Sequence, residues 1–195
     1  MSDIYKGLFK NLSALKTVNR TFANCFTLTG SITAEDNIFE NCNNLNSTYG
    51  LFSGCKNLGY NDQDNGISIP NNLFNNSARK KLENVAYMFA DCGFSGRIGV
   101  GSVPVNGEYN NKGLLAECIN LTTTEGMFAN CTNLKGAIPG DIFYTQNNED
   151  IYNNLTNISK MFCECWGLAT TYEDKSINGG NYPTPYQIDD KDQLD

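Results

Sequence analysis

The sequence predicts an α/β solenoid, a chain wound into stacked irregular coils, and three observations support this prediction. A short motif recurs along most of the chain, and its apolar residues follow a spacing that is neither a heptad nor a strict alternation. The composition is also typical of a turn-rich fold, because 29 Asn and 18 Gly accompany only 18 % charged residues. With 195 residues, the chain is long enough to bury a core as one large domain or two small ones.

The recurring motif has the template L-x-x-[V/I/T]-x-x-x-F-x-x-C-x-x-L. Complete copies lie at residues 15–28, 45–58, 121–134 and 155–168. Partial copies lie at residues 32–45, 82–95 and 115–121, and two further copies begin at Phe9 and Phe74 but have Leu12 or Ser77 in place of Cys. Seven of the eight cysteines occupy one template position, which makes the repeat a strong signal.

The spacing within the template also predicts the shape of each unit. Apolar residues at steps of three or four, followed by an abrupt turn, predict one helical or 3₁₀ turn and then a short extended piece. A single unit cannot bury its own Phe, Cys and Leu side chains, whereas stacked units contribute successive layers to one core. A longer unit of the form FxxCxxL…IPxxφF…LxxφxxMFxxC covers residues 52–92 and again residues 128–165.

The eight cysteines raise the alternative of a disulfide framework. The repeat favours reduced cysteines instead, because equivalent positions of successive coils point inward and place small thiols in one buried column. Leu12 and Ser77 occupy the same template position and cannot form disulfides. Cys163 and Cys165 form a C-x-C pair, but without His this is a weak metal signal and Cys165 already belongs to the repeat, so no metal site is predicted.

Charge and composition argue against several classes of function. A net charge of −7 with scattered Lys and Arg argues against nucleic-acid binding, and the cluster Arg79-Lys80-Lys81 is interpreted as a solvated turn. No apolar run approaches the ~18 residues of a membrane helix, and no secretory signal is visible, so membrane insertion is not expected. The chain has no His, which rules out Ser-His-Asp and Cys-His catalysis. The loop at residues 59–66 lacks the acidic ligands of a calcium loop, and no cofactor is expected.

The strings MFANCTNLKGAIPGDIF at residues 127–143 and MFADC at residues 88–92 resemble the BspA-like leucine-rich repeats of bacterial surface proteins. The resemblance covers about residues 8–168. It implies leucine-rich-repeat-like coils with a short parallel β-sheet on one face and turns or short helical turns on the other. Such repeats occur in adhesins of gut and oral bacteria, in protist surface proteins and in phage structural proteins. The Phe-to-Phe spacing varies from 13 to 26 residues, so irregular coils are expected.

Two regions are expected along the chain, a leucine-rich-repeat-like solenoid over residues 1–171 and a different C-terminal region over residues 172–195. The C-terminal region contains Gly179-Gly180, two prolines and an acidic end. Two interpretations stay open for it. It is either a cap followed by a flexible acidic tail, or a segment in which Tyr182 and Tyr186 dock onto a neighbouring subunit, such as another virion subunit.

The expected function is that of a non-enzymatic binding or structural module, which recognises a protein or a glycan, or assembles, through the solenoid surface. Residues between the core positions are expected to point outward, and short polar and Tyr side chains there suit such recognition. The same positions also fit solvated β residues without a function. The candidate binding residues are Thr29, Ser31, Tyr60, Thr122, Thr124 and Lys135.

Three hypotheses about the protein are weighed against the sequence. A phage virion component would need no secretory signal, because lysis releases the particle. A fragment of a bacterial cell-surface adhesin is the alternative, and both place the protein on a virion or an extracellular surface. A glycan-active enzyme would need two facing carboxylates. The candidates are Glu35, Asp36, Glu117 and Glu125, but nothing in the pattern brings them together, so no catalytic residue and no enzymatic activity are predicted.

Overall fold

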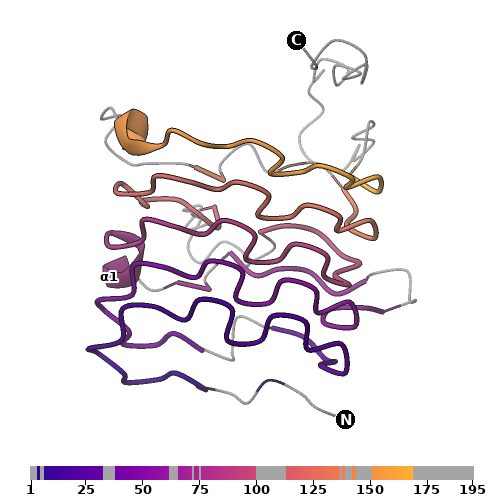
Figure 1. The fold of residues 1–195 in the computed structure, drawn as a ribbon, viewed down its shortest axis with the longest axis horizontal. Helices are drawn as coiled ribbons and strands as arrows, with labels where there is room; N and C mark the ends of the chain where they lie inside the picture. The colour runs from indigo at the N-terminus through magenta and orange to yellow at the C-terminus, as the bar shows by residue number, and fades with distance from the viewer. Residues whose placement is uncertain are drawn as a thin grey trace, which may run out of the picture.

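The computed structural model describes residues 4, 7–32, 38–61, 66–71, 73–74, 76–99, 113–136, 138, 142–143 and 151–168. These residues contain two short helical elements, α1 (Asn76–Arg79) and the 3₁₀-helix η1 (Ile151–Asn154). Most of the remaining described chain consists of turns that isolated parallel β-bridges connect (Figure 1). The predicted C-terminal region, residues 172–195, lies outside the described residues.

Five segments lie one above the other on one face of the molecule, from indigo to orange in Figure 1. We call them the front segments, numbered one to five in chain order: residues 15–28, 45–58, 82–95, 121–134 and 155–168. Parallel bridges connect neighbouring front segments at one equivalent position, through Thr17, Ser47, Asn84, Thr123 and Asn157. These five segments are the four complete copies of the template and the copy that departs from it only at Ser95.

Each front segment is built from two consecutive β-turns. In the second segment, the Leu51 N–H donates to the Thr48 carbonyl (3.1 Å) and the Cys55 N–H donates to the Phe52 carbonyl (3.0 Å). The third residue of each turn, Gly50 or Gly54, has a positive φ of 58° or 79°, as a type II turn requires. The other segments place Arg20, Tyr87, Gly126 and Lys160 at the first of these positions, and Asn24, Asp91, Asn130 and Glu164 at the second.

These turns differ from the helical or 3₁₀ turn that the spacing predicts, and for the front segments that prediction is wrong. A 3₁₀ turn and a β-turn both bring residues i and i+3 together, so the apolar spacing alone does not distinguish them. The residue with positive φ ends any helix there, because a right-handed helix needs a negative φ at every residue.

The backbone groups that the turns leave free pair between neighbouring front segments. From the first segment to the second, four alternate N–H groups donate to four carbonyls at 2.7–3.1 Å: Val18 to Ser47, Arg20 to Tyr49, Phe22 to Leu51 and Asn24 to Ser53. The same set of four hydrogen bonds recurs at each of the other three contacts between front segments. This pairing satisfies backbone groups that would otherwise be costly to bury.

The remaining copies of the template lie behind the front segments in Figure 1. We call them the back segments and identify them by Phe9, Phe39, Phe74 and Leu115. The rings of Phe9 and Phe39 stack at 5.5 Å, and those of Phe39 and Phe74 stack at 5.7 Å. Back and front copies alternate along the chain, and the stretches of sequence that connect them differ in length, so the Phe-to-Phe spacing in the sequence is irregular.

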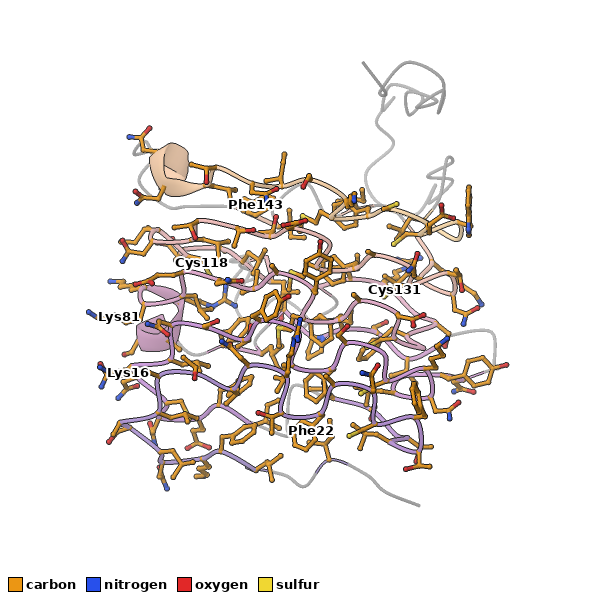
Figure 2. The ribbon with its side chains drawn as sticks, in the orientation of Figure 1. Lys16, Phe22, Lys81, Cys118, Cys131 and Phe143 are labelled. Atoms are coloured by element: carbon orange, nitrogen blue, oxygen red, sulfur yellow. The ribbon has the colours of Figure 1, made fainter. Side chains whose placement is uncertain are left out.

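A column of stacked phenyl rings runs through the core behind the front segments. The rings of Phe22, Phe52, Phe89, Phe128 and Phe162 follow one another at centroid distances of 5.5–5.9 Å, with planes within 10° of parallel. The three middle rings are fully buried. Figure 2 shows the side chains of these layers, with Phe22 toward one end of the column. Each unit therefore contributes one ring to a shared core, as the repeat predicts.

The repeated cysteine connects each layer to the previous one. The thiols of five cysteines donate to the carbonyl of the Phe in the preceding front or back segment: Cys42 to Phe9, Cys55 to Phe22, Cys92 to Phe52, Cys131 to Phe89 and Cys165 to Phe128, at 2.9–3.1 Å. All eight cysteines are free thiols. Burial raises the pKa of Cys55 and Cys165 to about 11 and that of Cys118 and Cys131 to about 12, so these groups are protonated donors at neutral pH.

Asparagine side chains form a second set of connections between layers. In the motif C-x-N-L, the Asn57 amide donates to the Phe26 carbonyl of the preceding front segment at 2.6 Å. Asn44 and Asn120, in the same motif of back segments, donate to the carbonyls of Ser13 and Lys80. Part of the high Asn content therefore has a specific structural role beyond turn formation.

Arg79 at the end of α1 is almost fully buried, with 3 % of its surface exposed. The sequence interpretation of Arg79-Lys80-Lys81 as a solvated turn is therefore wrong for Arg79, although Lys80 and Lys81 are exposed. Its guanidinium donates to five backbone carbonyls, those of Asn71, Phe74, Gly113, Leu114 and Ala116. Burial lowers the pKa of this group. The cation thus connects two neighbouring back segments.

Candidate binding surface

Polar and aromatic side chains form a continuous strip across all five front segments. The Arg20 guanidinium donates to the Tyr49 hydroxyl at 3.0 Å and lies 5.0 Å from the centre of its ring. The Tyr49 ring meets the Tyr87 ring edge to face at 6.0 Å. The Tyr87 hydroxyl donates to one Glu125 oxygen at 2.5 Å, and the Asn157 amide donates to the other at 3.0 Å. We call these five residues the tyrosine strip.

The turns of the front segments position these side chains. Arg20 and Tyr87 occupy the turn position with positive φ, while Tyr49 and Glu125 stand one residue earlier in the turns of the next segments. The position next to Tyr87 in the following segment is Gly126, where a Cβ would come within 2.4 Å of the Tyr87 ring. Gly50 has the same relation to Arg20, with 3.2 Å to the Arg20 Cγ. Glycine therefore lets the long side chains lie flat along the surface.

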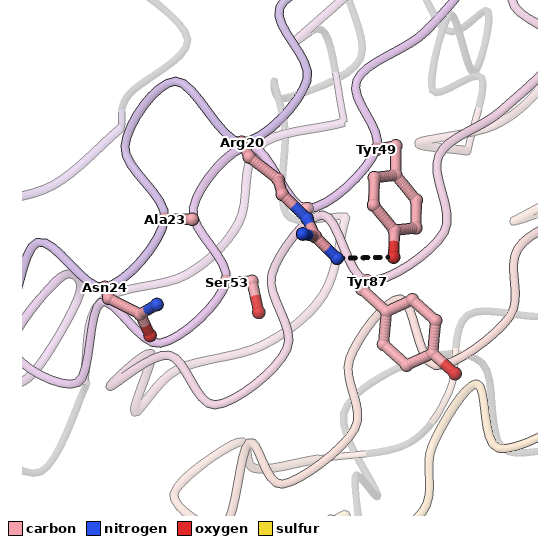
Figure 3. A pocket seen from close by; sticks show the side chains of 7 residues that line it. Arg20, Ala23, Asn24, Tyr49, Ser53 and Tyr87 are labelled. Atoms are coloured by element: carbon pink, nitrogen blue, oxygen red, sulfur yellow. Dashed lines mark hydrogen bonds between the residues drawn. The ribbon is translucent and has the colours of Figure 1, made fainter.

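The tyrosine strip borders a shallow, open groove of about 390 Å³. Arg20, Tyr49 and Tyr87 line it together with Ala23, Asn24, Gly50 and Ser53, as Figure 3 shows. Tyr49, Tyr87 and Glu125 are half-buried and Arg20 is exposed, so a ligand can reach rings, a cation and hydroxyls from one side. The hydrogen bond to Glu125 raises the pKa of Tyr87, which keeps its hydroxyl protonated.

A second groove, of about 520 Å³, lies beside the other turn of the later front segments. Its lining includes Lys56, Asp91, Asn130 and Glu164, and Lys56 forms an exposed ion pair with Asp91 at 3.5 Å. No aromatic ring lines it. The groove of the tyrosine strip is therefore the better candidate for recognition, because aromatic and Arg side chains dominate binding energies at protein surfaces.

The six binding residues predicted from the sequence do not gather at one place. Tyr60, Thr122 and Lys135 are exposed, with 55 % of the Tyr60 surface accessible, and Thr29 and Ser31 are half-buried. None of them lines either groove. The hydroxyl of Thr122 donates to the Glu83 carbonyl at 2.8 Å and so connects two front segments.

Thr124 corrects the expectation that these positions point outward. It is fully buried, and its hydroxyl donates to the Met161 sulfur at 3.4 Å. The reason is its place in the template, where it occupies the second apolar position. Thr48 occupies the same position, is also fully buried, and donates to the Met88 sulfur at 3.2 Å.

The carboxylates considered for catalysis are not brought together in the described structure. Glu35 and Asp36 lie outside the described residues, Glu117 is half-buried in a back segment, and Glu125 belongs to the tyrosine strip. Among the described residues, no group of three or more Cys, Asp or Glu side chains is placed to hold a metal ion. The described helices, each of four residues, include none that could span a membrane.

Sequence reasoning missed the tyrosine strip, because its residues stand at positions that the template leaves unspecified. A signal was present in the three-residue gap before each Phe. Three residues separate the second apolar position of the template from its Phe. The middle one of these three alternates between a long side chain and Gly in successive front segments: Arg20, Gly50, Tyr87, Gly126 and Lys160.

The chain matches no protein-family model, and comparisons with curated proteins and with solved structures found no similar protein.

Proposed function

We propose that the chain is a solenoid that acts as a non-enzymatic binding module and recognises a protein or a glycan through the tyrosine strip. The observation that carries this proposal is the continuity of the strip, from Arg20 on the first front segment to Asn157 on the fifth. Side chains from five separate parts of the sequence meet in one row, on a backbone that four hydrogen bonds per contact hold in register.

The chemistry of the strip suits recognition rather than catalysis. Tyrosine rings offer flat apolar area next to a hydroxyl, and Arg20 adds a cation with several donors. The side chains are held by one another before any ligand arrives, which reduces the entropy lost on binding. Both protein surfaces and sugar rings can use such a combination of stacking and hydrogen bonds.

The resemblance to BspA-like repeats extends the proposal to the place where the module works. We place it on a virion or on an extracellular surface, as an adhesion or assembly component. Genes for capsid and tail proteins next to its own gene would support the virion origin. A secretory signal in a longer gene product would support the cell-surface adhesin instead.

Binding of the full chain to glycan and protein arrays tests the function, followed by titration of each hit. We expect the double variant Tyr49→Ala/Tyr87→Ala to lose at least tenfold in affinity, whereas Tyr60→Ala, an exposed tyrosine outside the groove, keeps the affinity of the parent. Circular dichroism spectra of both variants control for folding. Affinity that depends on Tyr60 but not on the strip, or hydrolysis of a bound glycan, would contradict the proposal.

A further inference from the structure

We infer that copies of this chain stack head to tail, with the fifth front segment of one copy against the first front segment of the next. The two segments lie at opposite ends of the front stack, orange and indigo in Figure 1. This inference goes beyond the proposed binding function and rests on the two ends of the front stack, not on the groove of the tyrosine strip.

The backbone groups at the two ends are complementary. At the contact between the fourth and fifth segments, the N–H groups of Thr124, Gly126, Phe128 and Asn130 donate to the carbonyls of Asn157, Ser159, Met161 and Cys163. The equivalent donors on the fifth segment, at Ile158, Lys160, Phe162 and Glu164, have no hydrogen-bond partner within the described part of the chain. The equivalent acceptors on the first segment, at Thr17, Asn19, Thr21 and Ala23, are likewise without a partner among the described residues. Four donors thus match four acceptors in the register that the chain already uses four times.

The apolar layer at the fifth segment is open in the same place. Ile158 is 60 % exposed, although the four residues at its template position in the other front segments, Val18, Thr48, Val85 and Thr124, are at most 3 % exposed. The stacked ring column also ends there, at Phe162. The first segment of a second copy would continue this column with its Phe22 ring and cover Ile158.

Two exposed aromatic side chains mark the same contact. Phe26 and Trp166 are 56 % and 69 % exposed, and both stand directly after the repeated cysteine of their segments. The three segments between them have Lys56, Gly93 and Thr132 at this position. In a head-to-tail stack, the Trp166 of one copy and the Phe26 of the next become neighbours in one column, where each covers the other.

One pair of residues opposes this contact. Lys160 and Arg20 share the turn position with positive φ, so the stack brings two cations together. Added salt should therefore strengthen the association, because it screens like charges. Lys160→Gly should strengthen it further, since it removes one of the two charges.

Sedimentation velocity of the full chain over a concentration series tests the inference. We expect an average mass that rises with protein concentration and rises further with added salt. For Lys160→Gly, the same rise should occur at a protein concentration at least tenfold lower than for the parent. Ile158→Asp alters only the tail end and Phe26→Asp only the head end. Each variant alone should therefore stay monomeric, because every contact needs one intact head and one intact tail. A mixture of the two variants should form one-to-one dimers and nothing larger, through the one intact pair of ends. Ile119→Asp, at an exposed position of a back segment, should assemble like the parent.

Several outcomes would overturn the inference. A parent chain and a Lys160→Gly variant that remain monomeric at all concentrations and salt levels would do so. Assembly that Ile158→Asp leaves unchanged would also do so. A lowered melting temperature of Ile158→Asp without a change in sedimentation would mean that the chain itself covers this end, and would overturn it as well.

Discussion

The front and back segments match the same sequence template, but different interactions connect neighbouring segments on the two faces. On the front, five rings stack without interruption, and four consecutive contacts have a thiol-to-carbonyl hydrogen bond. On the back, the ring column passes through Phe9, Phe39 and Phe74 and then reaches Leu115. The copy at Phe74 has Ser77 in place of cysteine and contains α1.

The difference shows how an irregular copy can be accommodated in a regular stack. The Phe74 carbonyl, which a thiol would reach in a regular contact, accepts the Arg79 Nε–H at 3.0 Å instead. Cys118, the next cysteine on the back, is left with only a long contact of 3.8 Å to the Ala116 carbonyl. One buried cation with five donors thus replaces the small thiol at the place where the backbone departs from the repeat.

The largest expected effect comes from breaking the front ring column in its middle. Phe89 stacks on Phe52 and Phe128 and meets Phe94 edge to face, and it is fully buried. Phe89→Ala should lower the free energy of unfolding by about 3–5 kcal/mol, since it removes a buried ring and leaves a cavity. Chemical denaturation measures this loss. Phe9→Ala, at a half-buried back ring, is the matched variant and should cost clearly less; equal losses would mean that the two columns are equivalent.

The second effect concerns the cation of the back segments. Arg79→Met keeps the length of the side chain but leaves five buried carbonyls without their donors, so we expect a loss of about 3 kcal/mol in unfolding free energy. Arg79→Lys should recover only part of it, because an ammonium group cannot reproduce the fork of a guanidinium. The exposed Arg97 offers a control, and Arg97→Met should change stability by at most about 0.5 kcal/mol. A loss below 1 kcal/mol for Arg79→Met would show that the back segments do not depend on this group.

A single front thiol should have a smaller effect. Cys131→Ala removes a 2.9 Å hydrogen bond to the Phe89 carbonyl and a buried sulfur, which should cost about 1–2 kcal/mol. Cys118→Ala, on the back, removes a buried sulfur with only a long contact and should cost less. Cys163→Ala, at an exposed position, should be close to neutral. Thermal unfolding of the three variants orders them, and a larger loss for Cys118 than for Cys131 would contradict the role given to the thiol hydrogen bonds.

The sequence predicted much of this comparison, but not the alternation of two faces. Phe89 and Cys131 could be assigned to core layers, because their spacing repeats and a lone unit cannot bury them. The template by itself does not assign consecutive copies to opposite faces, since it contains no information about where the chain turns back. The degree of match to the template was a usable signal that was not applied, because the weaker copies at Phe9, Phe74 and Leu115 are all on the back.

The residues that sequence reasoning misjudged are those whose environment arises from chain geometry. Arg79 is next to two exposed lysines, and only the path of the back segments surrounds it with carbonyls. Tyr49 and Tyr87 are separated by 38 positions and become neighbours because their turns stack. Thr124 could have been assigned correctly, because the template itself places it in the core.

The smallest expected effect is the pH dependence of one front thiol. Burial raises the pKa of Cys131 from its ordinary value of 9.0 to about 12, so the folded protein holds this proton more tightly than the unfolded chain does. The resulting stability is complete below pH 9 and is lost as the pH rises from 9 toward 12. The cost of Cys131→Ala should therefore shrink by about 1 kcal/mol between pH 8 and pH 10, because the parent loses stability that the variant never had. Urea unfolding of both proteins at the two pH values measures the difference. A cost of Cys131→Ala that stays constant between the two pH values would mean that its thiol is not shielded from water.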